Sequence, residues 1–266
     1  MSKLILTEIW IYPIKSLPGI QVTTGTVMQK GMKGDRRFML IDQDNRFITQ
    51  RNHPRLSQFN LSYDSNKILV TPRGSTHQLS VPTEVNSKLS FPATIWNDTV
   101  EVVEVSPESS QWFSDALDMG CRLVYFPEKN ERRINPEYVR EEQHVGLADA
   151  YPYLIIGRNS LRDLNKRTSK EMVMKRFRPN LVFEGGEPYA EDSWSNFRIG
   201  DVVFTGVKPC DRCVLTTVDP ETGIKGDEPL RTLSTYRKVN GSVYFGQNVI
   251  AQNEGKINER EEIILL

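Results

Sequence analysis

Short segments rich in β-branched and aromatic residues recur along the chain, with turn residues between them. Such residues fit pleated, half-buried strands, and clusters of Gly, Pro, Asn and Asp mark the turns. In the first half the segments are 3–11, 21–28, 37–42, 46–50, 57–63, 68–72, 77–81 and 94–105. In the second half they are 121–126, 153–156, 181–183, 197–199, 201–209, 214–218, 245–252 and 262–265. Many short strands at this spacing predict an antiparallel sandwich or barrel.

Helical periodicity is confined to a few stretches. Residues 107–117 predict a helix, with Ser106 as its N-cap and Pro107 at the first helical position. A second helix is expected at 160–166 with Asn159 as its cap, and 230–236 is expected to form a helix or a turn. The predicted fold class is therefore mainly β with a few short helices.

The 266 residues are enough for one large or two modest domains. We expect an N-terminal domain at 1–120 and a C-terminal domain at 121–266, with a polar stretch at 127–146 near the division. Lys plus Arg equals Asp plus Glu, 34 against 34, which argues against a partner held by the overall field, such as a nucleic-acid polymer or an anionic membrane.

Location is inferred from what the sequence lacks. No apolar run approaches the roughly 18 residues that span a bilayer, and the N-terminus has no signal-peptide pattern. Three cysteines do not suggest a disulfide framework. The expected location is the cytoplasm.

The stretch 207–223 carries two cysteines, Cys210 and Cys213, with Arg212 between them. A structural zinc would need two more ligands at tight spacing, and the remaining Cys and His residues are isolated: His53, His77, Cys121 and His144. A thioredoxin-like pair should open a helix, whereas a β-branched segment, predicted as a strand, follows here. Two interpretations stay open. The thiols are inert and half-buried, or one thiolate is the ligand of a soft metal in an open site, favoured by the charge of Arg212.

Several polar residues have both an ordinary and a functional interpretation. Lys15 and Ser16 lie in a loop restrained by prolines, where a lysine is either solvated or holds an anion. Arg36 and Arg37 lie at a strand start, where either both are exposed or one faces inward and needs an anionic partner. Arg178 and Asn180 form either a turn or a donor set for phosphate and a heterocycle edge.

Asp149 either caps a local turn or accepts hydrogen bonds from heterocycle nitrogens. Taken together, the cations, amide groups and thiol describe a pocket suited to a phosphorylated heterocyclic cofactor that bears a soft metal.

Six short motifs resemble, in order, those of one known family. They are Tyr12–Ser16, Asp35–Arg36, Asp149–Ala150, Phe177–Asn180, Cys210–Cys213 with Thr216–Pro220, and Phe245–Asn248. The chain resembles MOSC domain proteins with an N-terminal MOSC β-barrel domain, and is similar to the bacterial and mitochondrial amidoxime-reducing component group. The resemblance covers nearly the whole chain, and the cysteine motif followed by Thr-Thr-Val-Asp-Pro is its most specific part.

The resemblance implies a molybdenum cofactor, a pterin dithiolene that carries a phosphate. Cys213 would be the molybdenum ligand and the catalytic residue. Lys15, Ser16, Arg36 and Arg178 would hold the phosphate or pterin, and Asp149, Asn180 and Arg212 would be further cofactor contacts. The resemblance also implies pyridoxal phosphate binding, as a property of the family.

The family's reaction is the reduction of small N-hydroxylated compounds: hydroxylamines, amidoximes and N-hydroxylated bases. Some bacterial relatives carry a ferredoxin-like domain with four cysteines, a motif that this sequence lacks. The resemblance therefore implies a separate electron-transfer protein of ferredoxin or flavoprotein type. Two alternatives are a sulfur carrier with a persulfide on Cys213, and a non-enzymatic cofactor-binding protein.

Overall fold

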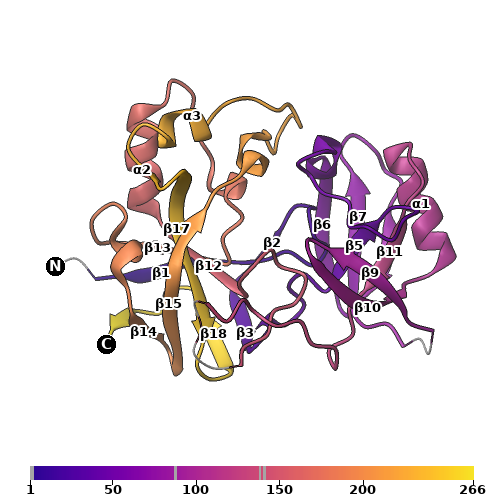
Figure 1. The fold of residues 1–266 in the computed structure, drawn as a ribbon, viewed down its shortest axis with the longest axis horizontal. Coiled ribbons are helices and arrows are strands. Elements are labelled where there is room, and N and C mark those ends of the chain that lie inside the picture. The colour runs from indigo at the N-terminus through magenta and orange to yellow at the C-terminus, as the bar shows by residue number, and fades with distance from the viewer. Residues whose placement is uncertain (1–2, 87–88, 138, 140–141) are drawn as a thin grey trace.

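A computed structural model describes residues 3–86, 89–137, 139 and 142–266. The fold is mainly β, as predicted, and Figure 1 shows two lobes joined through the middle of the molecule. One lobe holds the first strand and most of the second half of the chain, and the other holds most of the first half. None of the described helices is long and apolar enough to cross a membrane.

The larger lobe is built on one sheet that contains strands from both ends of the chain. Along the sheet the order is β19 (Ile263–Leu265), β14 (Asn196–Ile199), β15 (Val202–Asp211), β17 (Ser242–Ala251), β12 (Tyr153–Gly157), β13 (Leu181–Glu184), β1 (Ile5–Ile11) and β2 (Ile20–Val22). A short strand, β16 (Lys238–Val239), pairs with β17. The pair of β12 and β13 is parallel, and the other pairs are antiparallel.

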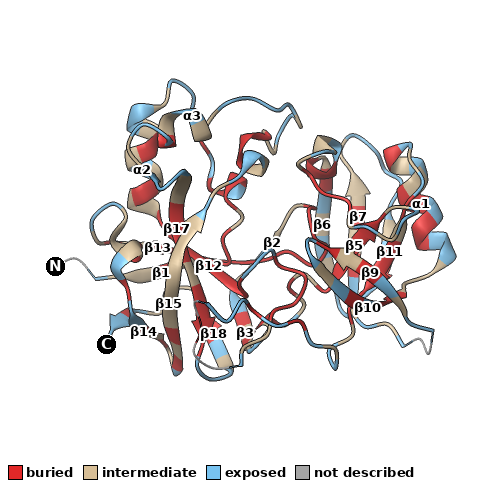
Figure 2. Ribbon diagram, viewed as in Figure 1, coloured by how far each residue is buried: buried red, intermediate tan, exposed pale blue. Residues whose placement is uncertain are grey.

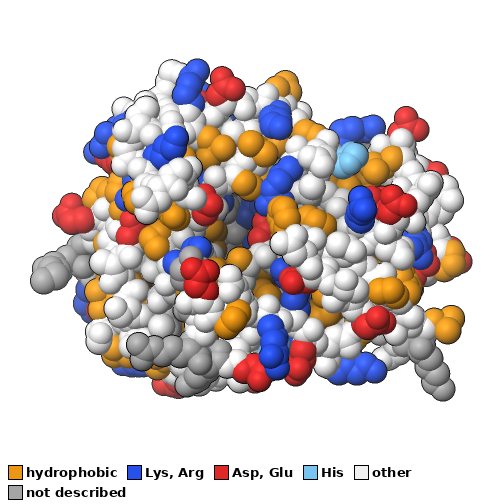
Figure 3. Space-filling model, viewed as in Figure 1, with side chains coloured by type: hydrophobic (Ala, Val, Ile, Leu, Met, Phe, Trp, Pro, Cys, Tyr) orange, Lys and Arg blue, Asp and Glu red, His pale blue; other side chains and the backbone are white. Residues whose placement is uncertain are grey.

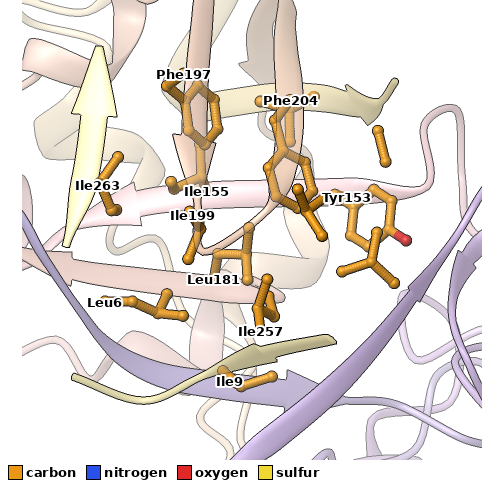
Figure 4. Packing of buried hydrophobic residues seen from close by; sticks show 14 of the residues in the cluster. Leu6, Ile9, Tyr153, Ile155, Leu181, Phe197, Ile199, Phe204, Ile257 and Ile263 are labelled. Atoms are coloured by element: carbon orange, nitrogen blue, oxygen red, sulfur yellow. The ribbon is translucent and has the colours of Figure 1, made fainter. Parts of the chain in front are cut away.

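The core of this lobe lies between the large sheet and a small one of β18 (Gly255–Asn258), β3 (Thr24–Met28) and β4 (Gly31–Met32). Phe197 and Phe204 are cross-strand partners, and their rings stack with centroids 5.4 Å apart. Figure 4 shows these rings packed above Ile155, with Ile257 of the small sheet below. Burial of such apolar side chains is the main force that holds the two sheets together.

The smaller lobe has two further sheets and a helix. One sheet runs β5 (Phe38–Ile41), β11 (Arg122–Tyr125), β10 (Asp98–Glu104), β9 (Phe91–Ile95), and the other runs β6 (Phe59–Asp64), β7 (Lys67–Pro72), β8 (Leu79–Pro82). Helix α1 (Pro107–Leu117) buries Trp112 and Phe113 against them. Figure 2 shows buried residues in the strands of this lobe, and both buried and exposed residues in α1.

The sheets connect residues on both sides of the expected domain division. Strand β1 joins the large sheet beside β13, whereas β11, which follows residue 120, pairs with β5 and β10. The division at 120/121 stays a prediction.

Helix boundaries agree with the sequence in one case and differ in another. Ser106 caps α1 by accepting a hydrogen bond from the Ser109 backbone nitrogen, as predicted. Helix α2 (Arg158–Arg167) begins earlier than expected, with Gly157 at its N-cap, and the predicted cap Asn159 instead donates to the Gly186 carbonyl. Helix α3 (Leu230–Leu233) is a single turn.

Three predicted strands are wrong in detail. The segment 94–105 is broken by a tight turn at Trp96, whose φ is 55°, between β9 and β10. The segment 21–28 is split into β2 and β3, and 46–50 makes only isolated bridges at Arg46 and Phe47. Four short 3-10 helices complete the described structure: η1 (Pro54–Ser57), η2 (Met174–Arg176), η3 (Ala190–Ser193) and η4 (Val214–Thr217).

Candidate functional site

A chamber of about 400 Å³ lies where the two lobes meet, and Figure 3 shows the hollow at the centre of the face in view. Its wall contains all eight residues that the sequence singled out: Lys15, Ser16, Arg36, Asp149, Arg178, Asn180, Arg212 and Cys213. Residues from opposite ends of the chain thus converge on one cavity. Their roles toward a ligand stay predictions.

The cysteine motif reaches the chamber at the end of β15. Cys210 lies in the last part of the strand, and Cys213 follows as the N-cap of η4. The prediction of a strand at 214–218 is wrong because the two threonines fold back on the preceding turn. Thr216 donates from its hydroxyl to the Cys213 carbonyl at 3.0 Å, and Thr217 donates to the Val214 carbonyl at 2.7 Å. These local hydrogen bonds override the extended preference of β-branched residues.

Each thiol of the motif contacts a different arginine. Arg51 donates from Nε to Cys213 Sγ across 3.1 Å, and Arg212 donates from Nη1 to Cys210 Sγ across 3.0 Å. Cys213 is exposed and Cys210 is half-buried. The charge expected from Arg212 at the proposed ligand thiol is therefore supplied by Arg51, which sequence analysis missed. Little in the sequence pointed to Arg51, since it lies 162 residues from Cys213 in a loop with no motif of its own.

Arg51 also belongs to an ion-pair network around Asp149. One carboxylate oxygen of Asp149 lies 2.8 Å from Arg51 Nη2, and the other lies 2.5 Å from Lys15 Nζ. Trp96 donates from Nε1 to the same carboxylate at 3.3 Å, and its ring lies 4.5 Å from the Arg51 guanidinium. Trp96 is the second residue of the site that the sequence did not indicate.

The network sets the charge state of its members. Burial lowers the pKa of Lys15 to about 8, against an opposing pull from Asp149. Burial alone would raise the pKa of Asp149, but Lys15 and Arg51 hold it well below its usual value. At neutral pH the wall therefore presents two cations around one carboxylate, with net positive charge beside the exposed thiol.

Two further arginines lie against Tyr12 in left-handed backbone conformations, with φ of 46° for Arg36 and 55° for Arg178. Their guanidinium carbons lie 4.5 and 4.3 Å from the Tyr12 ring centroid. Arg36 is neutralised by Asp35 at 2.5 Å. Arg178 donates to the Leu17 carbonyl at 2.6 Å but forms no ion pair with any described residue. Burial, with Arg36 nearby, lowers the pKa of Arg178 to about 10.

Arg178 is thus a cation whose charge is unmatched within the described part of the chain. Such a group is costly without an anionic partner, and left-handed non-glycine residues concentrate at functional sites. An oxyanion in the chamber would supply that partner.

The remaining predicted residues line the chamber in different ways. Asn180 is 1% exposed, donates to the Trp10 carbonyl at 3.1 Å and accepts from Arg36 at 3.0 Å, so its amide fixes Arg36 in place. Ser16 is buried with a φ of 70°. Among the described residues, no group of three or more His, Cys, Asp and Glu side chains is arranged to hold a metal ion.

Two family descriptions match successive parts of the chain. The description "MOSC N-terminal beta barrel domain" matches residues 3–120, and "MOSC domain" matches residues 142–264. The chain is therefore a two-part MOSC protein.

Similar curated proteins indicate to which MOSC proteins this chain is related. Human mitochondrial amidoxime-reducing component 1 is 33% identical over 279 residues, covering 98% of this chain and 82% of that protein. Human mitochondrial amidoxime reducing component 2 is 34% identical over 243 residues, covering 87% and 72%. Molybdenum cofactor sulfurase of Arabidopsis thaliana is 30% identical over 263 residues, covering 91% of this chain and 32% of that protein. The chain belongs to the family of MOSC proteins that includes the mitochondrial amidoxime-reducing components. The cytoplasmic location and pyridoxal phosphate binding stay predictions.

Proposed function

We propose that the chamber binds the molybdenum cofactor, with Cys213 as a metal ligand, and that the protein reduces N-hydroxylated compounds. The observation that carries the proposal is the presence in one chamber of an exposed thiol, Cys213, and a half-buried arginine, Arg178, that forms no ion pair with any described residue. The names of the relatives, amidoxime-reducing components and molybdenum cofactor sulfurase, support the same reading.

The residues present fit such a group. Cys213 offers a soft thiolate, which suits molybdenum, and Arg51 stabilises the negative charge of that thiolate. Arg178 and Lys15 offer cations to a phosphate, and the Arg212 Nε atom is buried with no hydrogen-bond partner among the described groups. A cofactor that brings its own sulfur ligands would need only one thiolate from the protein.

When bound, the cofactor supplies the two-electron exchange and the acceptance of oxygen from the substrate nitrogen. The chain's own residues hold and orient the reactants. Asn180 and Asp35 fix Arg36, Asp149 ties Arg51 to Lys15, and Trp96 forms part of the chamber wall. Electrons would come from a separate ferredoxin- or flavoprotein-type donor.

Metal and pterin analysis of protein purified from a cofactor-producing host tests binding. We expect near-stoichiometric molybdenum and pterin, lost in Cys213→Ala and kept in Cys121→Ala, a cysteine of the smaller lobe's core. Absence of both from the wild type would overturn the proposal. Cyanide-releasable sulfur on Cys213 without molybdenum would instead identify a sulfur carrier.

Activity is tested separately with benzamidoxime as substrate and reduced methyl viologen as an artificial donor. Loaded wild-type protein should form benzamidine, and Cys213→Ala should not. Loaded protein that leaves benzamidoxime and hydroxylamine unchanged would identify a cofactor-binding protein without this activity.

A further inference from the structure

A second cavity of about 210 Å³ lies beside the chamber and has a largely different wall. Of the residues that the structure describes, the two walls share only Arg178 and Leu215. Neighbouring residues of one loop contribute to different cavities, since Gln50 lines the second cavity and Arg51 lines the chamber. The second cavity also lies between the lobes, because its wall takes residues from η1 and β6 on one side and from η2 and η4 on the other.

The wall of the second cavity is strongly cationic. Among its described lining residues four are basic, Arg73, Lys175, Arg176 and Arg178, and none is Asp or Glu. Arg73 and Arg176 are paired with acids that lie outside the lining, Glu221 and Asp219. Lys175 and Arg178 form no ion pair with a described residue. The cavity therefore carries uncompensated positive charge that favours an anion.

The rest of the wall is apolar and aromatic. Trp10, Tyr12 and Phe59 contribute rings, and Leu215 and Val218 contribute aliphatic surface. Trp10, Tyr12, Phe59 and Val218 are at least nine-tenths buried in the protein. A cavity with these walls suits a flat ring, and its volume limits the ligand to a small molecule.

Gln50 contributes to the wall a buried polar side chain whose acceptor atom is unpaired within the described structure. The residue is 5% exposed, and its Oε1 atom has no hydrogen-bond partner among the described groups. Buried side-chain acceptors are normally paired, because an unpaired one keeps the cost of leaving water. A ligand in the cavity that donates an N–H or O–H to this atom would supply the missing partner.

We propose that the second cavity is a binding site for a small aromatic carboxylate that carries a hydrogen-bond donor on its ring. The carboxylate pairs with Arg178 and Lys175, the ring lies against Trp10 and Phe59, and the donor bonds to Gln50. Because Arg178 also lines the chamber, the carboxylate and an anion in the chamber share one guanidinium.

Isothermal titration calorimetry with 4-hydroxybenzoate tests the site on the protein as purified. We expect saturable binding, and at least tenfold weaker binding of the neutral 4-hydroxybenzamide, which lacks the charge. No binding of 4-hydroxybenzoate at 10 mM, or equal affinity for the neutral amide, overturns the proposal.

Two variants of wall residues, with one control variant, test whether the ligand binds in the second cavity. Lys175→Gln should weaken binding of 4-hydroxybenzoate about fivefold, whereas Lys166→Gln, an equal charge change at an exposed residue of α2 outside both cavities, should leave it unchanged. Gln50→Leu should weaken 4-hydroxybenzoate but not benzoate, which has no ring donor.

Lys15→Gln controls for binding in the chamber, because Lys15 lines only the chamber. Unchanged affinity in this variant supports the proposal. Affinity lost in Lys15→Gln but kept in Lys175→Gln and Gln50→Leu would place 4-hydroxybenzoate in the chamber and overturn it.

Discussion

Arg51 donates a hydrogen bond from Nε to Cys213 Sγ across 3.1 Å, although the two residues belong to different lobes of the molecule. The same guanidinium reaches Asp149 through Nη2 and Thr49 through Nη1. Its position is therefore fixed by three partners, and the thiol of the proposed metal ligand depends on a residue far from its own motif.

Replacing Arg51 should make Cys213 less reactive. A guanidinium in hydrogen-bond contact stabilises the thiolate, which is the nucleophilic form. We expect Arg51→Gln to slow alkylation of Cys213 by iodoacetamide at pH 7 about fivefold or more, and Arg51→Lys to slow it less. Peptide mass spectrometry reports the two cysteines separately.

The matched variant is Arg212→Gln, because Arg212 contacts Cys210 instead. It should slow alkylation of Cys210 and leave Cys213 close to the wild-type rate. If Arg212→Gln slows Cys213 more than Arg51→Gln does, the assignment of each arginine to its thiol is wrong.

The sequence predicted local features well where neighbouring residues determine them. Ser106 and Pro107 determine where α1 begins. The strand that ends near Cys210 was predicted from the residue types within it. The η4 helix escaped prediction because hydroxyl-to-carbonyl bonds of Thr216 and Thr217 outweigh their strand preference. That competition depends on side-chain rotamers, which residue types do not reveal.

Contacts between residues far apart in the sequence could not be predicted from local sequence patterns alone. The eight site residues were selected by the family resemblance and by residue chemistry, and the fold brings all of them to one chamber. Trp96 lies within a segment predicted as strand and Arg51 directly follows another, so nothing local marked either residue as part of a site. Pairing of β1 with β13 likewise joins residues about 170 positions apart, which no periodicity encodes.

The lowered pKa of Lys15 predicts how stability depends on pH. The folded pKa is about 8, below the ordinary value of 10.5, so between these values the unfolded chain binds more protons than the folded one. The free energy of unfolding should therefore rise with pH in this window, by about 1 to 2 kcal/mol between pH 7.5 and 9.5 from this group.

Urea unfolding of the wild type and of Lys15→Met across this range isolates the contribution. The difference in the free energy of unfolding between the wild type and Lys15→Met should change by about 1 to 2 kcal/mol over this range. Lys166→Met, at an exposed lysine, should show the same pH dependence as the wild type. Parallel curves for the wild type and Lys15→Met would show that the Lys15 ammonium keeps an ordinary pKa.

Removing Arg178 should lower cofactor occupancy without unfolding the protein. Its half-buried charge lacks an ion-pair partner in the described structure, so its loss costs the apoprotein little while an anion loses a donor. We expect pterin content of Arg178→Ala to fall about tenfold or more, with a free energy of unfolding within about 1 kcal/mol of the wild type.

Arg260→Ala is the matched control, since Arg260 is exposed and also has a left-handed backbone, with φ of 73°. Both substitutions remove an arginine from the same backbone conformation. Equal pterin content in the two variants would mean that Arg178 is not a phosphate contact.

Gly206 links the packing of the large sheet to the position of the cysteines. It lies in β15 next to a shift in register with β17, and its backbone nitrogen donates to the Ser195 carbonyl at 2.7 Å. A Cβ atom there would come 2.0 Å from the Trp194 carbonyl oxygen, which is a backbone atom that cannot move alone. Gly206→Ala must therefore displace the strand that leads to Cys210.

We expect Gly206→Ala to lower the free energy of unfolding by about 2 kcal/mol or more, as for other overpacked sites, measured by urea denaturation. Alkylation rates of both cysteines should change as well, because the strand end moves. Gly226→Ala is the control, since a Cβ at Gly226 meets nothing within 4 Å and its φ is not left-handed. Stability and alkylation rates of Gly206→Ala equal to those of Gly226→Ala would show that β15 tolerates a side chain at this point.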